Sequence, residues 1–197
     1  MNSTTRVCAA TLVVLSLAGC HSAMSSNSHD STPREGFDNS SKRWPLEFRV
    51  HYFGWHCFDT LSCEVSYSGW ASRMDEPSPS VASYGRPLED LLSAGRGPIV
   101  NFPPPALVSW RSRDGMPHHA EVDIGAIFKD QRVRHNVSRE DVTEHGNDTA
   151  PKVVLEVNDR TINVYMRATI WTKQEQIPGN PLSHSRDDLI KVYSRTY

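Results

Sequence analysis

The strongest constraint on the fold is the stretch 152–171, in which apolar side chains occupy every second position. The alternation runs on both sides of a polar Asn158-Asp159 pair, through Val153, Leu155, Val157, Ile162, Val164, Met166, Ala168 and Ile170. Successive side chains of a β-strand point to opposite faces, so this period predicts two half-buried strands joined by a turn at Asn158-Asp159. A hairpin of this kind must bury its apolar face against another layer.

Further segments carry the same period. Strands are predicted at 46–52, 63–67, 107–113 and 120–124, with an Asp114-Gly115 turn signal between the last two. In the first of these segments one face holds Leu46, Phe48, Val50 and Tyr52, and the opposite face holds Glu47, Arg49 and His51. The stretch 189–197 fits a strand or a helix equally well.

Helical signals are short. Pro87, a run of leucines and Gly95 predict about two turns of helix, and Ser138 predicts a cap before a brief helix at 139–141. The predicted fold class is therefore mainly β: an antiparallel β-sandwich, or a sheet with one or two short helices.

The second face of the 152–171 hairpin leaves two interpretations open. Tyr165, Arg167 and Trp171 share the face opposite Val164. Either a second layer covers the hairpin, or these residues form an aromatic and basic surface of the kind that is enriched at binding hot spots.

Residues 1–20 form a separate pattern, MNSTTRVCAATLVVLSLAGC. Arg6 precedes an apolar run, 7–18, that is too short to span a membrane as a helix. The closing Leu17-Ala18-Gly19-Cys20 resembles the lipobox of bacterial lipoproteins. The resemblance implies that 1–19 are a cleaved signal peptide and that Cys20 carries the lipid anchor; a buried N-terminal helix with a chance cysteine is the alternative. By the sorting pattern of that family, a histidine rather than an aspartate at position 21 implies the outer membrane, with the domain on its periplasmic face.

The chain then divides by composition. Residues 20–43 hold the lipidated cysteine and a polar stretch with seven serines, which predicts a flexible tether. Residues 44–197 are predicted to form a single β-rich domain. The formal net charge of −2 gives no indication of a nucleic-acid partner.

Two cysteines remain within the predicted domain. In an oxidising periplasm, Cys57 and Cys63 are expected to form a disulfide. The alternative is a metal site that also uses His51 and His56, although the spacing matches no common zinc pattern.

Recognisable catalytic motifs are missing from the sequence: it contains no G-x-S-x-G, no H-E-x-x-H and no glycine-rich phosphate loop. We therefore assign no catalytic residue, metal ligand or cofactor, and we expect a protein that is not an enzyme. The alternative is a hydrolase that uses His118 and His119 with an acid.

Two charged groups are the candidate partner-binding residues. One is the turn with Arg111, Arg113 and Asp114. The other is an acidic stretch that contains Glu140, Asp141, Glu144 and Asp148. This stretch is either a solvated loop without a specific role or a surface that binds a basic region of a partner protein.

A second resemblance rests on three stretches: the run Trp110-Arg111-Ser112-x-Asp114-Gly115-x-x-His118, the hairpin LEVNDRTINVYMRA (155–168) and the ending SRDDLIKVYSRTY (185–197). They are similar to small lipoproteins that act as immunity proteins against lipase effectors of bacterial type VI secretion systems. The resemblance implies a membrane-anchored protein whose partner is a secreted phospholipase or lipase. The alternative function is a structural or assembly lipoprotein of an envelope secretion system.

Overall fold

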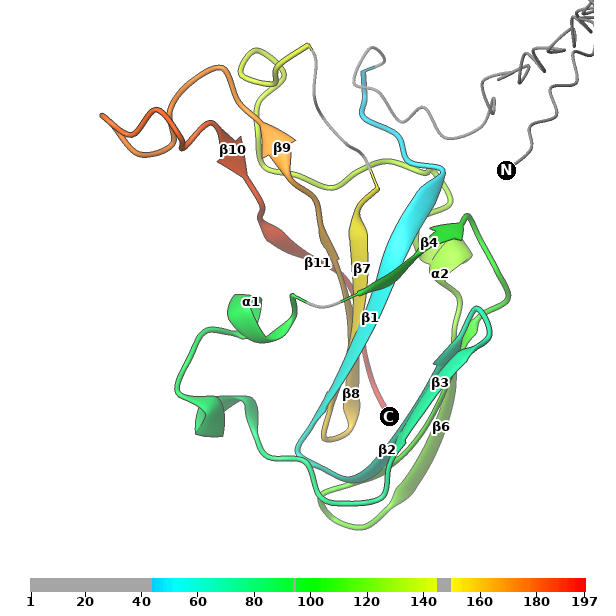
Figure 1. Ribbon diagram of the computed structural model, residues 1–197. Helices are drawn as coiled ribbons and strands as arrows, with labels where there is room; N and C mark the ends of the chain where they lie inside the picture. Colours follow the sequence, from blue (N-terminus) through cyan, green and yellow to red (C-terminus); the bar gives the residue numbers. More distant parts are fainter. Residues whose placement is uncertain (1–43, 94, 145–149) are drawn as a thin grey trace, which may run out of the picture. The chain divides into compact units, whose positions relative to one another are not determined.

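The computed structural model describes residues 44–93, 95–144 and 150–197. They form two β-sheets that face each other, with a two-stranded ribbon at one end (Figure 1). The lipobox, Cys20 and the tether lie outside the described residues. Within the described ranges, no helix has the length and apolar character needed to cross a membrane. The predicted fold class, mainly β with two short helices, is confirmed.

The larger sheet has five strands in the order β11-β8-β7-β1-β4. Their bounds are β1 Val50–Phe58, β4 Arg96–Val100, β7 Lys152–Asn158, β8 Thr161–Arg167 and β11 Leu189–Thr196. Strands β1 and β7 are parallel, whereas the other pairs are antiparallel. The parallel pair arises because the whole second sheet intervenes between β1 and β7 in the chain.

The smaller sheet has the order β3-β2-β5-β6 and is antiparallel throughout. Its strands are β2 Thr60–Tyr67, β3 Trp70–Met74, β5 Ala106–Ser112 and β6 Pro117–Val122. The remaining elements are a 3-10 turn η1 (Val81–Tyr84), helices α1 (Leu88–Leu91) and α2 (Ile124–Ile127), and the paired strands β9 (Ile170–Trp171) and β10 (Ser185–Arg186).

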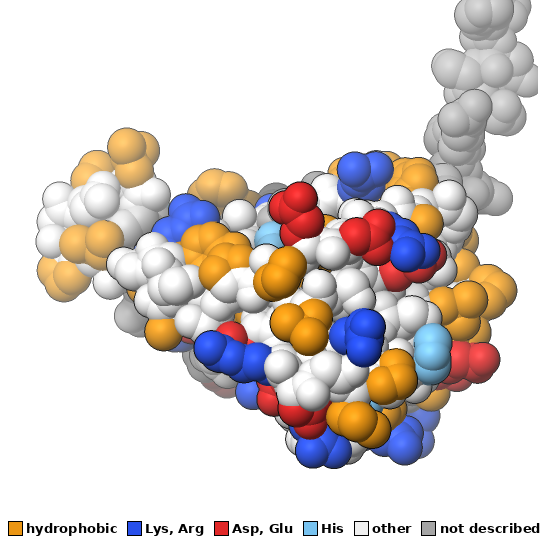
Figure 2. Space-filling model, turned by 90° about the horizontal axis from the view of Figure 1, so that it is seen from below, with side chains coloured by type: hydrophobic (Ala, Val, Ile, Leu, Met, Phe, Trp, Pro, Cys, Tyr) orange, Lys and Arg blue, Asp and Glu red, His pale blue; other side chains and the backbone are white. Residues whose placement is uncertain are grey.

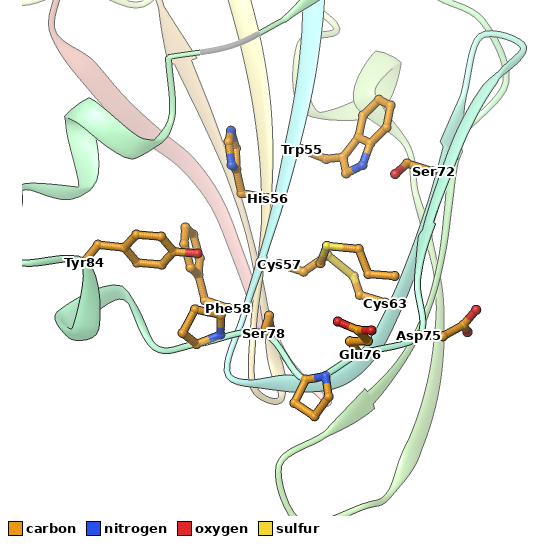
Figure 3. Close-up of a pocket in the computed structure, with 13 residues that line it drawn as sticks. Trp55, His56, Cys57, Phe58, Cys63, Ser72, Asp75, Glu76, Ser78 and Tyr84 are labelled. Carbon is orange, nitrogen blue, oxygen red and sulfur yellow. A yellow bond between two sulfur atoms is a disulfide. The ribbon is translucent and has the colours of Figure 1, made fainter.

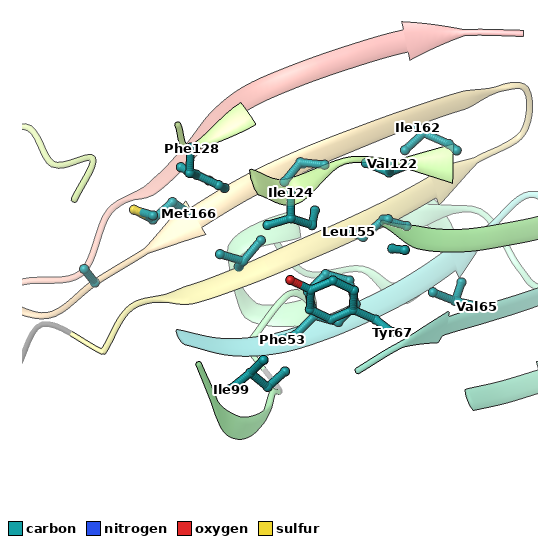
Figure 4. Packing of buried hydrophobic residues seen from close by; sticks show 14 of the residues in the cluster. Phe53, Val65, Tyr67, Ile99, Val122, Ile124, Phe128, Leu155, Ile162 and Met166 are labelled. Atoms are coloured by element: carbon teal, nitrogen blue, oxygen red, sulfur yellow. The ribbon is translucent and has the colours of Figure 1, made fainter. Parts of the chain in front are cut away.

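The main core lies between the two sheets. Figure 4 shows Phe53 of β1 beside Tyr67 of β2, and their ring centroids are 4.2 Å apart. Val65, Leu155 and Val164 are fully buried around them. Burial of such side chains contributes about 1.5–3 kcal/mol each, so this contact holds the two sheets together.

The hairpin predicted at 152–171 is present as β7 and β8, but its turn is displaced by one residue. Asn158 pairs with Thr161, so the turn residues are Asp159 and Arg160. Asp159 has a φ of 50°, the left-handed conformation that aspartate tolerates in turns.

The alternation predicted for 46–52 holds from Leu46 to Val50, where the apolar side chains are buried and the polar ones are exposed, but it fails at His51. The strand begins only at Val50, and His51 is fully buried instead of facing solvent. The segment before it forms a single bridge, from Glu47 to Arg132, and β1 is irregular between His51 and Phe53. These irregularities in the backbone change which side chains face the core. The pattern of apolar residues in the sequence does not reveal such a change.

Other boundaries also differ. Ile124, predicted at the end of a strand, begins α2, because the Asp123 carboxylate caps the helix by accepting the N–H of Ala126 at 2.9 Å. The helix predicted at 87–95 is the single turn α1, and 139–141 is a turn rather than a helix. The ambiguous C-terminal stretch is strand β11, while strands β3 and β4 were not predicted.

A second layer covers the outer face of the larger sheet. Phe58, Val154 and Tyr165 pack there against Leu91 and Leu92 of the α1 segment. This confirms the two-layer interpretation of the hairpin's second face.

Arg167 and Trp171, the other two residues predicted on that face, do not belong to this second layer. The Arg167 guanidinium lies 2.8 Å from the Asp187 carboxylate and donates to the carbonyl of Glu89 at 2.7 Å. Trp171, on β9, is 43 % exposed.

The predicted disulfide between Cys57 and Cys63 is present. It spans the bend at which the chain leaves β1 for β2, and so it fastens one sheet to the other. The metal alternative is thereby excluded for these cysteines, whose sulfur atoms are bonded to each other.

Replacing Cys57 and Cys63 together by serine is expected to lower the free energy of unfolding by about 2 kcal/mol, the value for a loop this short. Urea unfolding measures the change. A reducing agent should destabilise the wild-type protein by a similar amount and leave the double variant unaffected. Equal unfolding midpoints for oxidised wild type and variant would contradict the stabilising role.

Candidate functional sites

The first predicted group, Arg111, Arg113 and Asp114, lies at the β5–β6 turn. The Arg113 guanidinium donates to the Asp59 carboxylate at 2.8 Å, and its backbone N–H donates to Asp159 Oδ1 at 2.9 Å. Arg111 donates to the Gly115 carbonyl at 3.1 Å. Figure 2, which views this end, shows basic, acidic and apolar side chains interspersed. These contacts join three turns to one another, so the arginines already have partners within the chain.

Beside this turn the structure assembles a serine, an aspartate and a histidine. The buried Ser112 hydroxyl donates to the Asp114 carboxylate, and its oxygen lies 2.9 Å from His118 Nε2. The hydrogen bonds from Ser112 and the Met116 N–H hold the pKa of Asp114 below its usual range.

The order of these contacts differs from that of a catalytic triad, in which the histidine lies between the serine and the acid. Here the serine lies in the middle. Its single hydrogen goes to Asp114, so His118 Nε2 must donate to Ser112 rather than accept its proton. His118 also stacks on Trp110, with ring centroids 4.9 Å apart, whereas the neighbouring His119 contacts Ser109. The cluster therefore fixes the turn.

The second predicted group lies at the opposite end of the domain. Val142 pairs with Thr172, beyond the end of β8, whereas Arg113 contacts the turn where β8 begins. The structure thus does not bring the two predicted groups together. Glu140 and Glu144 are exposed, and Asp148 lies outside the described residues.

Asp141 and Glu140 support a loop that the sequence analysis did not single out. The Asp141 carbonyl accepts the Lys173 N–H at 2.7 Å, and its carboxylate accepts the Gln174 N–H at 2.9 Å. The Glu140 carbonyl accepts the Lys173 ammonium at 2.8 Å. The acidic stretch therefore forms the base of this loop, residues 173–184, which we call the finger.

The finger projects from the two sheets between β9 and β10 (Figure 1). Its tip is apolar and open to solvent: Ile177 is 59 % exposed and Leu182 is 88 % exposed, with Pro178 and Pro181 between them. Single exposed apolar residues are ordinary on protein surfaces, but four in one projecting loop form a patch.

Hydrogen bonds within the finger fix its shape. The Gln176 N–H donates to the Ser183 carbonyl at 2.8 Å, and the Gly179 N–H donates to the Glu175 carboxylate at 2.8 Å. Gly179 has a φ of 80°, a conformation that favours glycine. The sequence of the finger has no periodic pattern. Its projection could have been suspected only from the two isolated apolar residues on either side of Pro-Gly-Asn-Pro.

A pocket of about 640 Å³ opens on one side of the domain (Figure 3). Strand β4 pairs with β1 only as far as Phe53, and β3 is the last strand of the other sheet. Both sheets therefore end along this side, and the pocket lies between the edges of β1 and β3. Its volume falls within the range of ligand sites.

Two histidines, the buried His51 and the half-buried His56, make the stability of the protein sensitive to pH. His51 Nδ1 lies 2.7 Å from Asn101 Oδ1, and Nε2 lies 3.1 Å from the Tyr67 hydroxyl; burial lowers the pKa of His51, partly offset by Asn101. Burial also lowers the pKa of His56, partly offset by Glu156, and the buried His56 Nε2 atom has no hydrogen-bond partner among the residues that the structure describes.

Stability is expected to fall as the pH drops below about 6.5, because the unfolded chain then binds protons that the folded histidines resist. Above that pH both histidines are neutral in the unfolded chain as well, so the stability no longer depends on their protonation. The loss approaches about 1.4 kcal/mol per pH unit for each histidine that stays neutral. Urea unfolding at pH 7.5 and pH 5.0 measures it. The variant His51→Gln should show a shallower dependence, and an unchanged dependence would contradict this assignment.

Comparison of the chain with protein-family models, curated proteins and solved structures finds no match.

Proposed function

We propose that the protein is an immunity protein, anchored in the bacterial cell envelope through Cys20, that binds a secreted lipase effector and blocks its substrate cleft. The observation that carries the proposal is the finger, a projecting loop with an ordered backbone and an apolar tip. Enzymes that hydrolyse lipids bind acyl chains in apolar grooves, and such a groove is complementary to this tip.

The finger has the properties of a preorganised binding loop. Its backbone is already hydrogen-bonded, so less conformational entropy is lost on binding. At its base, Lys173 is bonded to the Glu140 carbonyl, and Glu175 is bonded within the loop. Trp171, which is 43 % exposed, lies in β9 just before the base of the finger. Aromatic anchors of this kind often dominate the binding energy of an interface.

The tether supports the same proposal. A lipase effector acts on the bilayer, and an inhibitor held there through the tether predicted for residues 20–43 would have a high local concentration near its target. A bilayer is a weaker candidate for the finger's partner, because the cations that favour anionic lipid surfaces are not gathered at the tip.

The proposal is tested by deleting the gene and exposing the strain to sibling cells that deliver an active lipase effector. Sensitivity that a plasmid copy of the gene reverses is the expected result, together with stoichiometric inhibition of the purified effector. Survival of the deletion strain would overturn the proposal. Loss of secretion without sensitivity would favour the assembly lipoprotein instead.

A further inference from the structure

The pocket between β1 and β3 has a distinct chemistry from the finger. Its upper part is lined by the indole of Trp55, and its floor by the Cys57–Cys63 disulfide (Figure 3). Met74 and Tyr84, both more than 40 % exposed, also line it. A ligand there meets aromatic and sulfur surfaces that favour an apolar stem.

The segment 75–79 crosses the lower end of the pocket and holds it in place. The Ser78 N–H donates to the Thr60 carbonyl at 2.8 Å, and the Asp59 N–H donates to the Pro79 carbonyl at 3.2 Å. The edges of β1 and β3 do not pair with each other above this segment, so the backbone of the fold itself forms the pocket.

One negative charge at the pocket is uncompensated. Asp75 is paired with Arg73 at 2.8 Å, whereas the Glu76 carboxylate forms no ion pair or hydrogen bond with any residue that the structure describes. Figure 3 shows Glu76 below the disulfide, on the side of the pocket opposite Trp55. Burial lowers the pKa of His56, so this lining residue stays neutral near pH 7.

We propose that this pocket binds an ammonium group carried on a short apolar stem. The carboxylate of Glu76 would attract the cation, and the apolar surface that reaches from the disulfide to Trp55 would cover the stem. A free amine and the headgroup of a choline lipid share this chemistry. The site is independent of the finger and of the proposed function.

The test uses the purified protein and three probes with the same stem: hexyltrimethylammonium, hexan-1-ol and hexanoate. Calorimetric titration is expected to show that the cation binds about tenfold or more tightly than the alcohol, and that hexanoate binds most weakly. Equal affinity for the cation and the alcohol would overturn the proposal.

Variants locate the binding. Glu76→Gln should weaken binding of the cation about fivefold without changing the affinity for the alcohol. Trp55→Ala should weaken the cation and the alcohol alike, because it removes part of the apolar wall that covers the stem. Glu121→Gln, an exposed carboxylate on β6, is the matched control and should have no effect. Unchanged affinity in Glu76→Gln would contradict the site.

The source of the ammonium group is distinguished with vesicles. Binding to phosphatidylcholine vesicles but not to phosphatidylglycerol vesicles, competed by hexyltrimethylammonium, would assign a lipid headgroup. Binding of the free probe alone would assign a soluble amine. Both outcomes support the ammonium site, whereas absence of binding in both arms would overturn it.

Discussion

Replacing Ile177 and Leu182 together by aspartate is expected to reduce the affinity for the lipase effector at least about a hundredfold. Each substitution removes an apolar contact and places a charge where a dry interface would form, and hot-spot losses of this kind reach 2 kcal/mol or more per residue. Two such losses exceed the roughly 2.7 kcal/mol that a hundredfold change requires.

The stability of this double variant should stay within about 0.5 kcal/mol of the wild type, because both side chains are exposed in the free protein. Effector inhibition and thermal unfolding are measured on the same samples. Leu107→Asp is the matched control, since Leu107 is 53 % exposed on β5 and lies outside the finger. Full inhibition by the finger variant would show that the effector binds elsewhere.

Replacing Glu156 by alanine is expected to lower the free energy of unfolding by about 3–5 kcal/mol, similar to breaking a buried charged contact. Glu156 is only 1 % exposed on the outer face of the larger sheet. Its carboxylate accepts hydrogen bonds from the Tyr165 hydroxyl at 2.7 Å and from the amides of Asn163 and Asn158 at 2.9 and 3.1 Å. Alanine would leave these donors buried and unpaired.

Glu156→Gln is the control for volume. It keeps one carbonyl oxygen as acceptor, so we expect a smaller loss of about 1–2 kcal/mol, and Tyr165→Phe should cost about 1 kcal/mol because it removes a single donor. Chemical denaturation gives all three values. Equal losses for the alanine and glutamine variants would show that the hydrogen-bond network contributes little.

Local patterns predicted the elements whose alternation is uninterrupted. The β7–β8 and β5–β6 hairpins are present in the predicted segments, because contacts between neighbouring strands follow from the alternation and the turn residues. The β7–β8 turn is shifted by one residue, and β6 begins at Pro117 rather than at Ala120. The disulfide was predictable for a similar reason, since its cysteines are only six positions apart in the chain. Strand β4 was missed because Gly97 and Pro98 interrupt its sequence, and its pairing with β1 is a long-range contact.

The surroundings of the candidate site residues are set by contacts between segments that lie far apart in the sequence. Arg113 and Asp141 were selected for their charge, yet in the folded protein each binds another segment of the chain: Arg113 binds Asp59, and Asp141 binds the base of the finger. Charge in a sequence indicates what a side chain is able to bind, but it does not indicate whether the fold already supplies the partner.

The sequence by itself determined the mainly β class, the two hairpins and the cysteine pairing, because these follow from period and from short separations along the chain. Only the tertiary structure decided that His51 faces inward, that Glu156 is buried among three donors and that both sheets end beside Trp55. Each of these features requires strands from distant parts of the chain to meet, and their pairing is set by the packing of the two sheets as a whole.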